Sequence, residues 1–312
     1  MKVTWPHGRA FALTICDDTD NGTLANLKPV YDALASNGLH TTKTVWSLPC
    51  KPDDQFWGET LSHVAYLQWV LELSRQGFEI AWHGTRSGGS TRAEIIEGID
   101  LFRRELGAWP DTYANHANNV ENIYWGLERF DNPLLRFLYA RARRGQPAFQ
   151  GSKPQSPHYW LDVCSERLQY VRDFTFRDIV TSEVDPWMPY HDPRRDEVRA
   201  WFSSTAAADV EKFVHLLTPT NIDRLESSGG VCILYTHFGS GFVTNGKLDG
   251  RVAGVLRELA KRNGWYVPVR AILRHLESVS GLHTLGKRER SVLEWRWTRE
   301  HSAAAVKRVF RL

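Results

Sequence analysis

A regular alternation of strand-like and helix-like segments most constrains how this chain can fold. Short apolar runs of the strand type are followed by stretches with apolar residues at helical spacing, several of which end at glycine. The expected strands are 11–16, 41–48, 78–82, around 113, 231–236 and 265–269, and the expected longer helices are 24–34, 59–75, 91–106, 206–217, 252–259 and 271–276. This order favours a parallel sheet or barrel with helices on its outer face.

Two regions depart from the alternation. Residues 128–205 mix basic, aromatic and proline-containing segments, and we interpret them as an insertion on the substrate side. No Ser/Gly/Pro-rich linker divides the 312 residues, so we expect a single α/β domain over residues 1–281. Residues 282–312 form a basic, aromatic tail.

Charge and terminal composition bear on the partners. The amino terminus has no uninterrupted apolar run of the signal-peptide or membrane-span type, and we expect a cytoplasmic protein. The formal net charge is only +3, and we predict no nucleic-acid partner. Beyond Leu285 there are eight Lys/Arg against three Glu, so the tail could bind an anionic membrane surface. Its interrupted apolar pattern favours packing against the barrel instead.

Ionisable side chains follow several of the expected strands. Asp17 and Asp18 end the first strand, and His83, His116 and His237 follow three others. In a barrel the carboxyl ends of the strands meet at one mouth, so we expect these side chains to converge. Adjacent carboxylates repel each other unless a cation or strong donors lie between them. Taken singly, each Asp is also explained as a helix cap and each His as a structural residue, but together they favour a divalent metal site.

The order of these elements resembles the polysaccharide deacetylase family, also called the NodB-homology or carbohydrate esterase family 4 domain, over residues 9–276. The segments that carry the resemblance are Asp17-Asp18, Glu79–His83, Ile233–His237 and Trp265–Val269, with a weak match at Asp185–Trp187. The resemblance implies a distorted (β/α) barrel that hydrolyses acyl groups with the help of a metal. It also implies that Asp17 is the catalytic base, Asp18 and His83 are metal ligands, and His237 is the general acid.

The sequence departs from the family pattern in two places. The family's second metal-binding His lies four residues after the first, and Ser87 occupies that position here. We expect His116 to supply the missing imidazole, with Asp20, Ser87 or water as the alternatives. The Arg that orients the catalytic Asp in the family's third motif is also missing, and Arg86 or Arg92 is the candidate for that role.

If the resemblance holds, the protein removes an acetyl group from an N- or O-acylated sugar, with zinc favoured as the metal. Asp17 would take a proton from the attacking water, and His237 would protonate the departing amine or alcohol. The substrate contacts that we expect are Arg86, Arg92, Asn118, Trp187 and Tyr235. With a cytoplasmic location, an intracellular precursor of a surface glycan is the expected partner. The alternatives are a glycan-binding protein that has lost the metal, which metal analysis would reveal, and an unrelated metal-dependent hydrolase on a barrel.

Overall fold

Seven parallel strands close into a barrel. They are β1 (Phe11–Asp17), β2 (Thr42–Val45), β3 (Glu79–Trp82), β4 (Thr112–Ala114), β5 (Tyr170–Phe176), β7 (Ala200–Ala206) and β8 (Val231–Thr236). Each pairs with the next in this order, and β8 pairs with β1 to complete the ring. The computed structural model describes residues 3–116, 118–142 and 148–310, with side chains placed up to residue 301. The barrel that the sequence predicted is therefore confirmed.

Shorter strands extend and distort this barrel. They are β6 (Tyr190–His191), β11 (Gly264–Tyr266) and β12 (His283–Thr284), with a separate hairpin of β9 (Val243–Thr244) and β10 (Lys247–Leu248). One edge of β1 is shared between two neighbours: residues 11–13 pair with β11, and residues 16–17 pair with β2. Strand β2 therefore pairs only with the carboxyl end of β1, the end that leads into the loop with Asp18 and Asp20.

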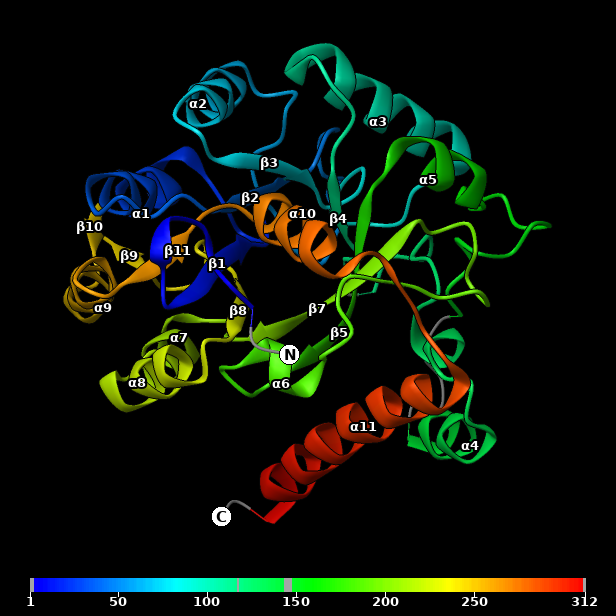
Figure 1. Cartoon of the computed structure of the whole chain (residues 1–312). Coiled ribbons are helices and arrows are strands. Elements are labelled where there is room, and N and C mark those ends of the chain that lie inside the picture. Colours follow the sequence, from blue (N-terminus) through cyan, green and yellow to red (C-terminus); the bar gives the residue numbers. More distant parts are fainter. Residues whose placement is uncertain (1–2, 117, 143–147, 311–312) are drawn as a thin grey trace.

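Helices surround the barrel on the outside (Figure 1). They are α1 (Leu24–Ser36), α2 (Val64–Arg75), α3 (Arg92–Leu106), α4 (Pro133–Ala142), α5 (Leu161–Arg167), α6 (Thr181–Val184), α7 (Val210–Leu216), α8 (Pro219–Ser228), α9 (Gly250–Ala260), α10 (Val269–Ser280) and α11 (Lys287–Phe310), with 3-10 turns η1 (Pro6–Gly8) and η2 (Gly126–Arg129). None of the helices in the described ranges is both long and apolar enough to cross a membrane.

Local sequence signals explain where these helices begin and end. Helix α3 starts at a capping box in which the Thr91 hydroxyl accepts from the Glu94 backbone N–H and the Glu94 carboxylate accepts from the Thr91 N–H. It ends at Gly107, whose φ of 81° is accessible to glycine at little cost. The helix buries Ile95, Ile99 and Phe102, the face that the apolar spacing predicted.

Residues 128–205 are not an insertion, because β5 and β7 of the barrel come from this region. Strand β5 (YVRDFTF) lacks the uninterrupted apolar run of the other central strands. Its two charged residues are nevertheless buried, since Arg172 pairs with Asp18 and Asp173 pairs with Arg290. Charges that are satisfied by partners far away in the sequence hide a strand from an analysis of hydropathy alone.

The carboxyl-terminal helix α11 packs across β5 and α4. Leu293 and Trp297 are buried, in agreement with the packing favoured for the tail. Two of its charged residues are buried as well: Arg290 pairs with Asp173, and the Glu294 carboxylate accepts from the backbone N–H groups of residues 131 and 132.

Candidate metal centre

Three potential metal ligands meet at the carboxyl end of the barrel. Asp20 lies in the loop after β1, His83 directly follows β3, and His116 lies two residues after β4. The Asp20 Oδ1 atom is 3.5 Å from His83 Nε2 and 3.2 Å from His116 Nε2. One donor atom from each residue lies within 4.8 Å of the other two, and all three residues are buried.

The donor atoms of this cluster fit a divalent ion. His83 Nε2, His116 Nε2 and Asp20 Oδ1 are buried and accept no hydrogen bond from any described residue. Such orphaned atoms are costly unless a ligand satisfies them. Donor atoms bound tetrahedrally at about 2.1 Å from one zinc ion lie about 3.4 Å apart, close to the two separations to Asp20. Two imidazoles and a carboxylate also match the ligands that zinc and similar metals prefer.

The surroundings orient the imidazoles. His116 Nδ1 lies 3.0 Å from Asn119 Oδ1, while the Asn119 amide donates to the backbone carbonyl of Arg86. In the neutral imidazole, donation from Nδ1 to Asn119 leaves Nε2 free of a proton, and Nε2 is the atom that faces Asp20. Burial lowers the pKa of His83, which favours the neutral imidazole that binds metals. Trp46 stacks on His83 at 6.2 Å between ring centroids and limits the motion of that ring.

Asp18 lies beside the cluster, and its carboxylate is held by an arginine. Arg172 on β5 donates to both carboxylate oxygens, at 2.9 and 2.5 Å. Asp18 Oδ2 is 3.9 Å from His83 Nε2. Burial acts to raise the pKa of Asp18, but Arg172 and His83 outweigh it and the pKa is lowered. The carboxylate therefore stays ionised next to the metal-binding atoms.

Asp17 lies in a different, fully buried environment. Its Oδ2 atom is 2.9 Å from Lys43 Nζ and accepts from the Tyr31 hydroxyl at 3.1 Å. Its Oδ1 atom accepts from the Phe238 backbone N–H at 2.8 Å. Asp17 and Lys43 are direct cross-strand neighbours in the pairing of β1 with β2. Both oxygens are thus occupied, and Asp17 links β1 to the loop that carries His237.

Replacing Lys43 by Met is expected to lower the free energy of unfolding by about 3–5 kcal/mol, because it leaves the Asp17 carboxylate buried without its cation. Urea unfolding measures the loss. Lys28→Met breaks an exposed pair with Asp32 and should cost at most about 1 kcal/mol. The double variant Asp17→Asn/Lys43→Met should lose less than the sum of its single variants. A Lys43→Met protein as stable as the wild type would contradict a structural role for this pair.

His237 approaches the cluster from the opposite side. It follows β8, and its Nδ1 atom lies 2.6 Å from the Ala208 carbonyl oxygen, so Nδ1 carries a proton and donates it there. The Nε2 atom faces Asp20 Oδ2 at 3.5 Å. The His237 side chain is 19% exposed, compared with 7% for Asp20, 3% for His116 and 1% for His83. It can therefore exchange a proton with a bound molecule.

The residues expected to contact substrate are dispersed. Tyr235 lies near the cluster, with the Arg172 guanidinium 4.8 Å from its ring centroid. Arg86 is buried and pairs with Glu94, and the exposed Asn118 donates to Gln55.

Arg92, the first residue of α3, forms a bidentate ion pair with Asp162 on α5. The same guanidinium also donates to the backbone carbonyl oxygen of Tyr159, at 2.9 Å. Neither Arg86 nor Arg92 contacts Asp17 or Asp18, so neither takes the orienting role considered for them.

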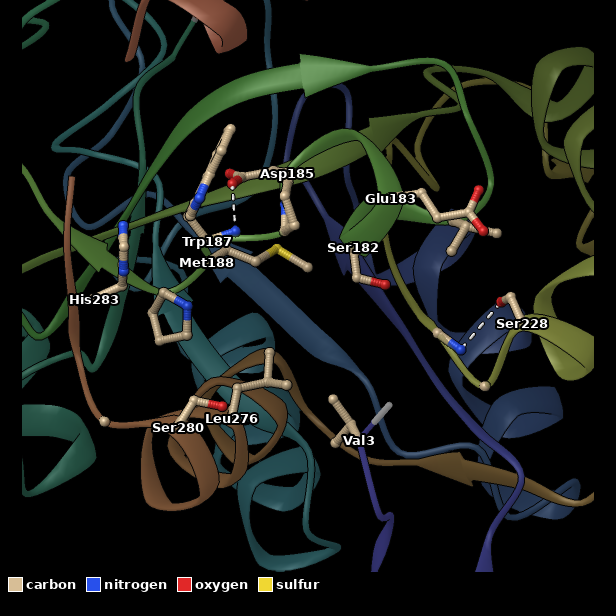
Figure 2. A pocket seen from close by; sticks show the side chains of 16 residues that line it. Val3, Ser182, Glu183, Asp185, Trp187, Met188, Ser228, Leu276, Ser280 and His283 are labelled. Carbon is tan, nitrogen blue, oxygen red and sulfur yellow. Dashed lines mark hydrogen bonds between the residues drawn. The ribbon is translucent and has the colours of Figure 1, made fainter. Parts of the chain in front are cut away.

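Trp187 does not reach the metal cluster. It borders a pocket of about 500 Å³ that is also lined by Ser228, at the amino end of β8 and thus at the other end of the barrel (Figure 2). Asp185, beside it, is fully buried and accepts from the Ser203 hydroxyl and the Trp187 backbone N–H. Burial raises the pKa of Asp185 to about 6.

This raised pKa predicts a pH-dependent stability. Asp185 binds its proton more tightly in the folded protein, so its contribution to stability is complete below about pH 4 and is lost as the pH rises to about 6. Asp185→Asn should remove that loss. Between about pH 4 and pH 6 the free energy of unfolding of the variant should therefore rise by about 3 kcal/mol relative to that of the wild type. Urea unfolding of both proteins across the interval measures the difference, and a constant difference would contradict the raised pKa.

Two residues of the site could not be assigned from the sequence. Asp20 was only one of several alternatives for the missing ligand, although the run Asp17–Asp20 already contained three carboxylates. Arg172 was hidden in the region taken for an insertion. An arginine between Val171 and Phe174 in an otherwise strand-like segment was the available signal.

Comparisons with known proteins agree with this architecture. No model of a protein family matches the sequence, and no curated protein matches it. Among solved structures, a protein from Mycobacterium smegmatis assigned as a polysaccharide deacetylase superposes with a TM-score of 0.52 and 14% identity, over 92% of this chain and 97% of that one. A probable polysaccharide deacetylase from Pseudomonas aeruginosa PAO1 gives 0.52 and 12%, over 89% and 95%.

A further solved structure with this fold has a different activity. PuuE allantoinase superposes with a TM-score of 0.52 and 14% identity, over 89% of this chain and 93% of that one. At such identities the likeness establishes the architecture and leaves the substrate open. The chain therefore has the fold of the polysaccharide deacetylases, the NodB-homology (β/α) barrel.

Proposed function

We propose that this protein is a metal-dependent hydrolase that removes an acyl group from an acylated sugar. The observation that carries the proposal is the cluster of Asp20, His83 and His116, whose converging donor atoms are buried and lack hydrogen-bond partners among the described residues. A complete ligand set of this kind supports an enzyme over a glycan-binding protein that has lost its metal.

The geometry leads us to reassign two of the roles that the sequence implied. Asp20, rather than Asp18, is proposed as the carboxylate ligand, because only Asp20 contributes a donor atom to the cluster. Asp18, rather than Asp17, is proposed as the catalytic base, because it lies at the cluster while Asp17 is enclosed by Lys43 and Tyr31. His83 and His116 keep their proposed roles as ligands.

The proposed reaction divides the work among these residues. Asp20, His83 and His116 would hold a divalent ion, which would supply a Lewis acid for the acyl carbonyl and lower the pKa of water. Asp18 accepts the proton of the attacking water, and Arg172 keeps that carboxylate ionised and aligned. The remaining residue of the site, His237, acts on the leaving group.

His237 is proposed to protonate the departing nitrogen or oxygen from Nε2. The Ala208 carbonyl fixes the ring through Nδ1, and Nε2 lies 3.5 Å from Asp20 Oδ2, at the cluster. The reaction would yield acetate, when the acyl group is acetyl, and the deacylated sugar. An N- or O-acylated precursor of a surface glycan, handled in the cytoplasm, is the substrate class that we propose.

Acetate release tests the function. The zinc-loaded protein should release acetate from N-acetylated oligosaccharides or O-acetylated sugars, and the Asp18→Asn protein should not. Allantoin serves as the comparison substrate, because an allantoinase shares the fold. Opening of the allantoin ring without acetate release would replace the sugar substrate with a cyclic amide. Binding of oligosaccharides by the metal-loaded protein, with no hydrolysis of any substrate, would favour a glycan-binding protein.

A further inference from the structure

Exposed apolar side chains concentrate on one part of the surface. Six of the nine exposed large hydrophobic residues in the described ranges are Leu127 on η2, Leu134, Phe137 and Leu138 on α4, and Val292 and Trp295 on α11. Helix α4 contacts both η2 and α11, and Figure 1 shows α4 beside α11 on the outer side of the barrel. Such a concentration on adjoining elements indicates a surface that binds another apolar body.

Helix α4 is apolar on two sides. Leu135 is buried, and Tyr139, one turn later, packs against Phe130 and the buried Trp297. On the outer side Leu134, Phe137 and Leu138 are 53%, 63% and 44% exposed, at the i, i+3 and i+4 spacing of one helical face. A helix that only covers a core carries polar residues on its outer face, so this outer stripe is not explained by the fold.

Helix α11 continues the pattern with positive charge. Arg288, Val292, Trp295 and Arg299 follow one another at i, i+4, i+7 and i+11, which places them along one side of the helix, and all four are exposed. Val292 and Trp295 are 38% and 45% exposed and lie between the two arginines. Tryptophan and arginine side by side suit the boundary between water and lipid.

The exposed charges on α4 and on the part of α11 with described side chains are positive, and Glu128, beside Leu127 on η2, is paired with Lys153. Helix α4 carries Arg136 and Arg141, both exposed, and its sequence contains no acidic residue. The acidic residues of α11 within the described side chains are engaged by backbone N–H groups: Glu289 at Gly286, Glu294 at residues 131 and 132, and Glu300 at Arg177. No ion pair among the described residues neutralises Arg136, Arg141, Arg288 or Arg299.

We propose that the outer faces of α4 and α11 form a surface that binds an anionic lipid bilayer. A second copy of this chain would bring two positively charged rims together at a twofold interface, and the like charges would oppose that dimer. An anionic bilayer offers apolar chains for Leu134, Phe137 and Trp295, and negative headgroups for the arginines. This inference is independent of the proposed hydrolytic function, and its test requires no substrate.

Co-sedimentation with vesicles tests the proposal on the full chain. The protein should bind vesicles of phosphatidylcholine with phosphatidylglycerol, bind pure phosphatidylcholine much more weakly, and dissociate as salt is raised. The combined variant Leu134→Gln/Phe137→Gln/Leu138→Gln should lose the binding. Arg288→Gln should weaken it about fivefold, the factor that corresponds to about 1 kcal/mol for one near-surface charge.

The control is Val64→Gln on α2, which removes an apolar residue that is 72% exposed, more than any residue of the triple variant, and lies away from this surface. This variant should bind vesicles like the wild type. Circular dichroism establishes that each variant is folded, and Arg288→Gln, which changes an exposed side chain on α11, keeps the test valid if the triple variant unfolds. Absence of vesicle binding by the wild type would overturn the proposal. Dimerisation abolished by the triple variant, or binding of poly-L-glutamate without vesicles, would likewise overturn it in favour of a protein partner.

Discussion

Replacing Asp20 by Ala is expected to release the metal ion and to abolish hydrolysis. The substitution removes the one carboxylate, among the residues that the structure describes, that contributes a donor atom to the cluster with His83 and His116. Loss of an outer-shell partner of a metal ligand already costs roughly 10–100-fold in metal affinity, so loss of the ligand itself should cost more. Elemental analysis after dialysis, together with a zinc titration, measures the effect. The side chain contributes little to core packing, and the fold should persist.

Asp18→Asn is the matched control for that experiment. It removes a charge two residues away, on a side chain that pairs with Arg172 and contributes no atom to the cluster. The variant should therefore retain the metal. If Asp20→Ala kept a full complement of metal while Asp18→Asn lost it, the ligand assignment implied by the sequence resemblance would stand, and ours would be wrong.

The second large effect is expected on turnover. Asp18→Asn should lower kcat by about 10²–10⁴, the range for a positioned general base, while the metal content changes little. The melting temperature should fall, because the substitution breaks a buried ion pair. The amide cannot accept the proton of water, and the Arg172 guanidinium loses its anionic partner. Steady-state kinetics of the zinc-loaded protein measures the loss.

Asp17→Asn distinguishes the two carboxylates. Asp17 is enclosed by Lys43, Tyr31 and the Phe238 backbone N–H, so its replacement should reduce stability more than it reduces the chemical step. An Asp18→Asn protein with normal kcat, beside an Asp17→Asn protein that is folded, metal-loaded and inactive, would return the role of base to Asp17.

Much of the fold could be predicted from the sequence because most barrel strands are apolar runs followed by helical spacing. Strands β1 and β8 are buried almost throughout, so each can be recognised in the sequence as a largely apolar run. The same pattern placed His83, His116 and His237 at strand ends, since the residue after a parallel strand lies at the mouth of the barrel. Their convergence in the structure follows from this topology.

The remaining parts depended on contacts between residues far apart in the sequence. Strand β5 buries Arg172 and Asp173, whose partners Asp18 and Arg290 lie more than one hundred residues away. The choice among Asp17, Asp18 and Asp20 depended on which side of β1 and its loop each carboxylate faces. Lys43 on the neighbouring strand pairs with Asp17, and Arg172 pairs with Asp18. Asp20 is the carboxylate that lies next to the two imidazoles. The spacing of the three carboxylates along the chain does not show which partner each of them has.

The most direct test of the central claim is anomalous scattering from a crystal of the zinc-loaded protein at the zinc absorption edge. The assignment predicts one peak per chain, at about 2.1 Å from His83 Nε2, His116 Nε2 and an Asp20 carboxylate oxygen. A peak coordinated by Asp18 in place of Asp20, or no peak between the two imidazoles in zinc-saturated crystals, would contradict it.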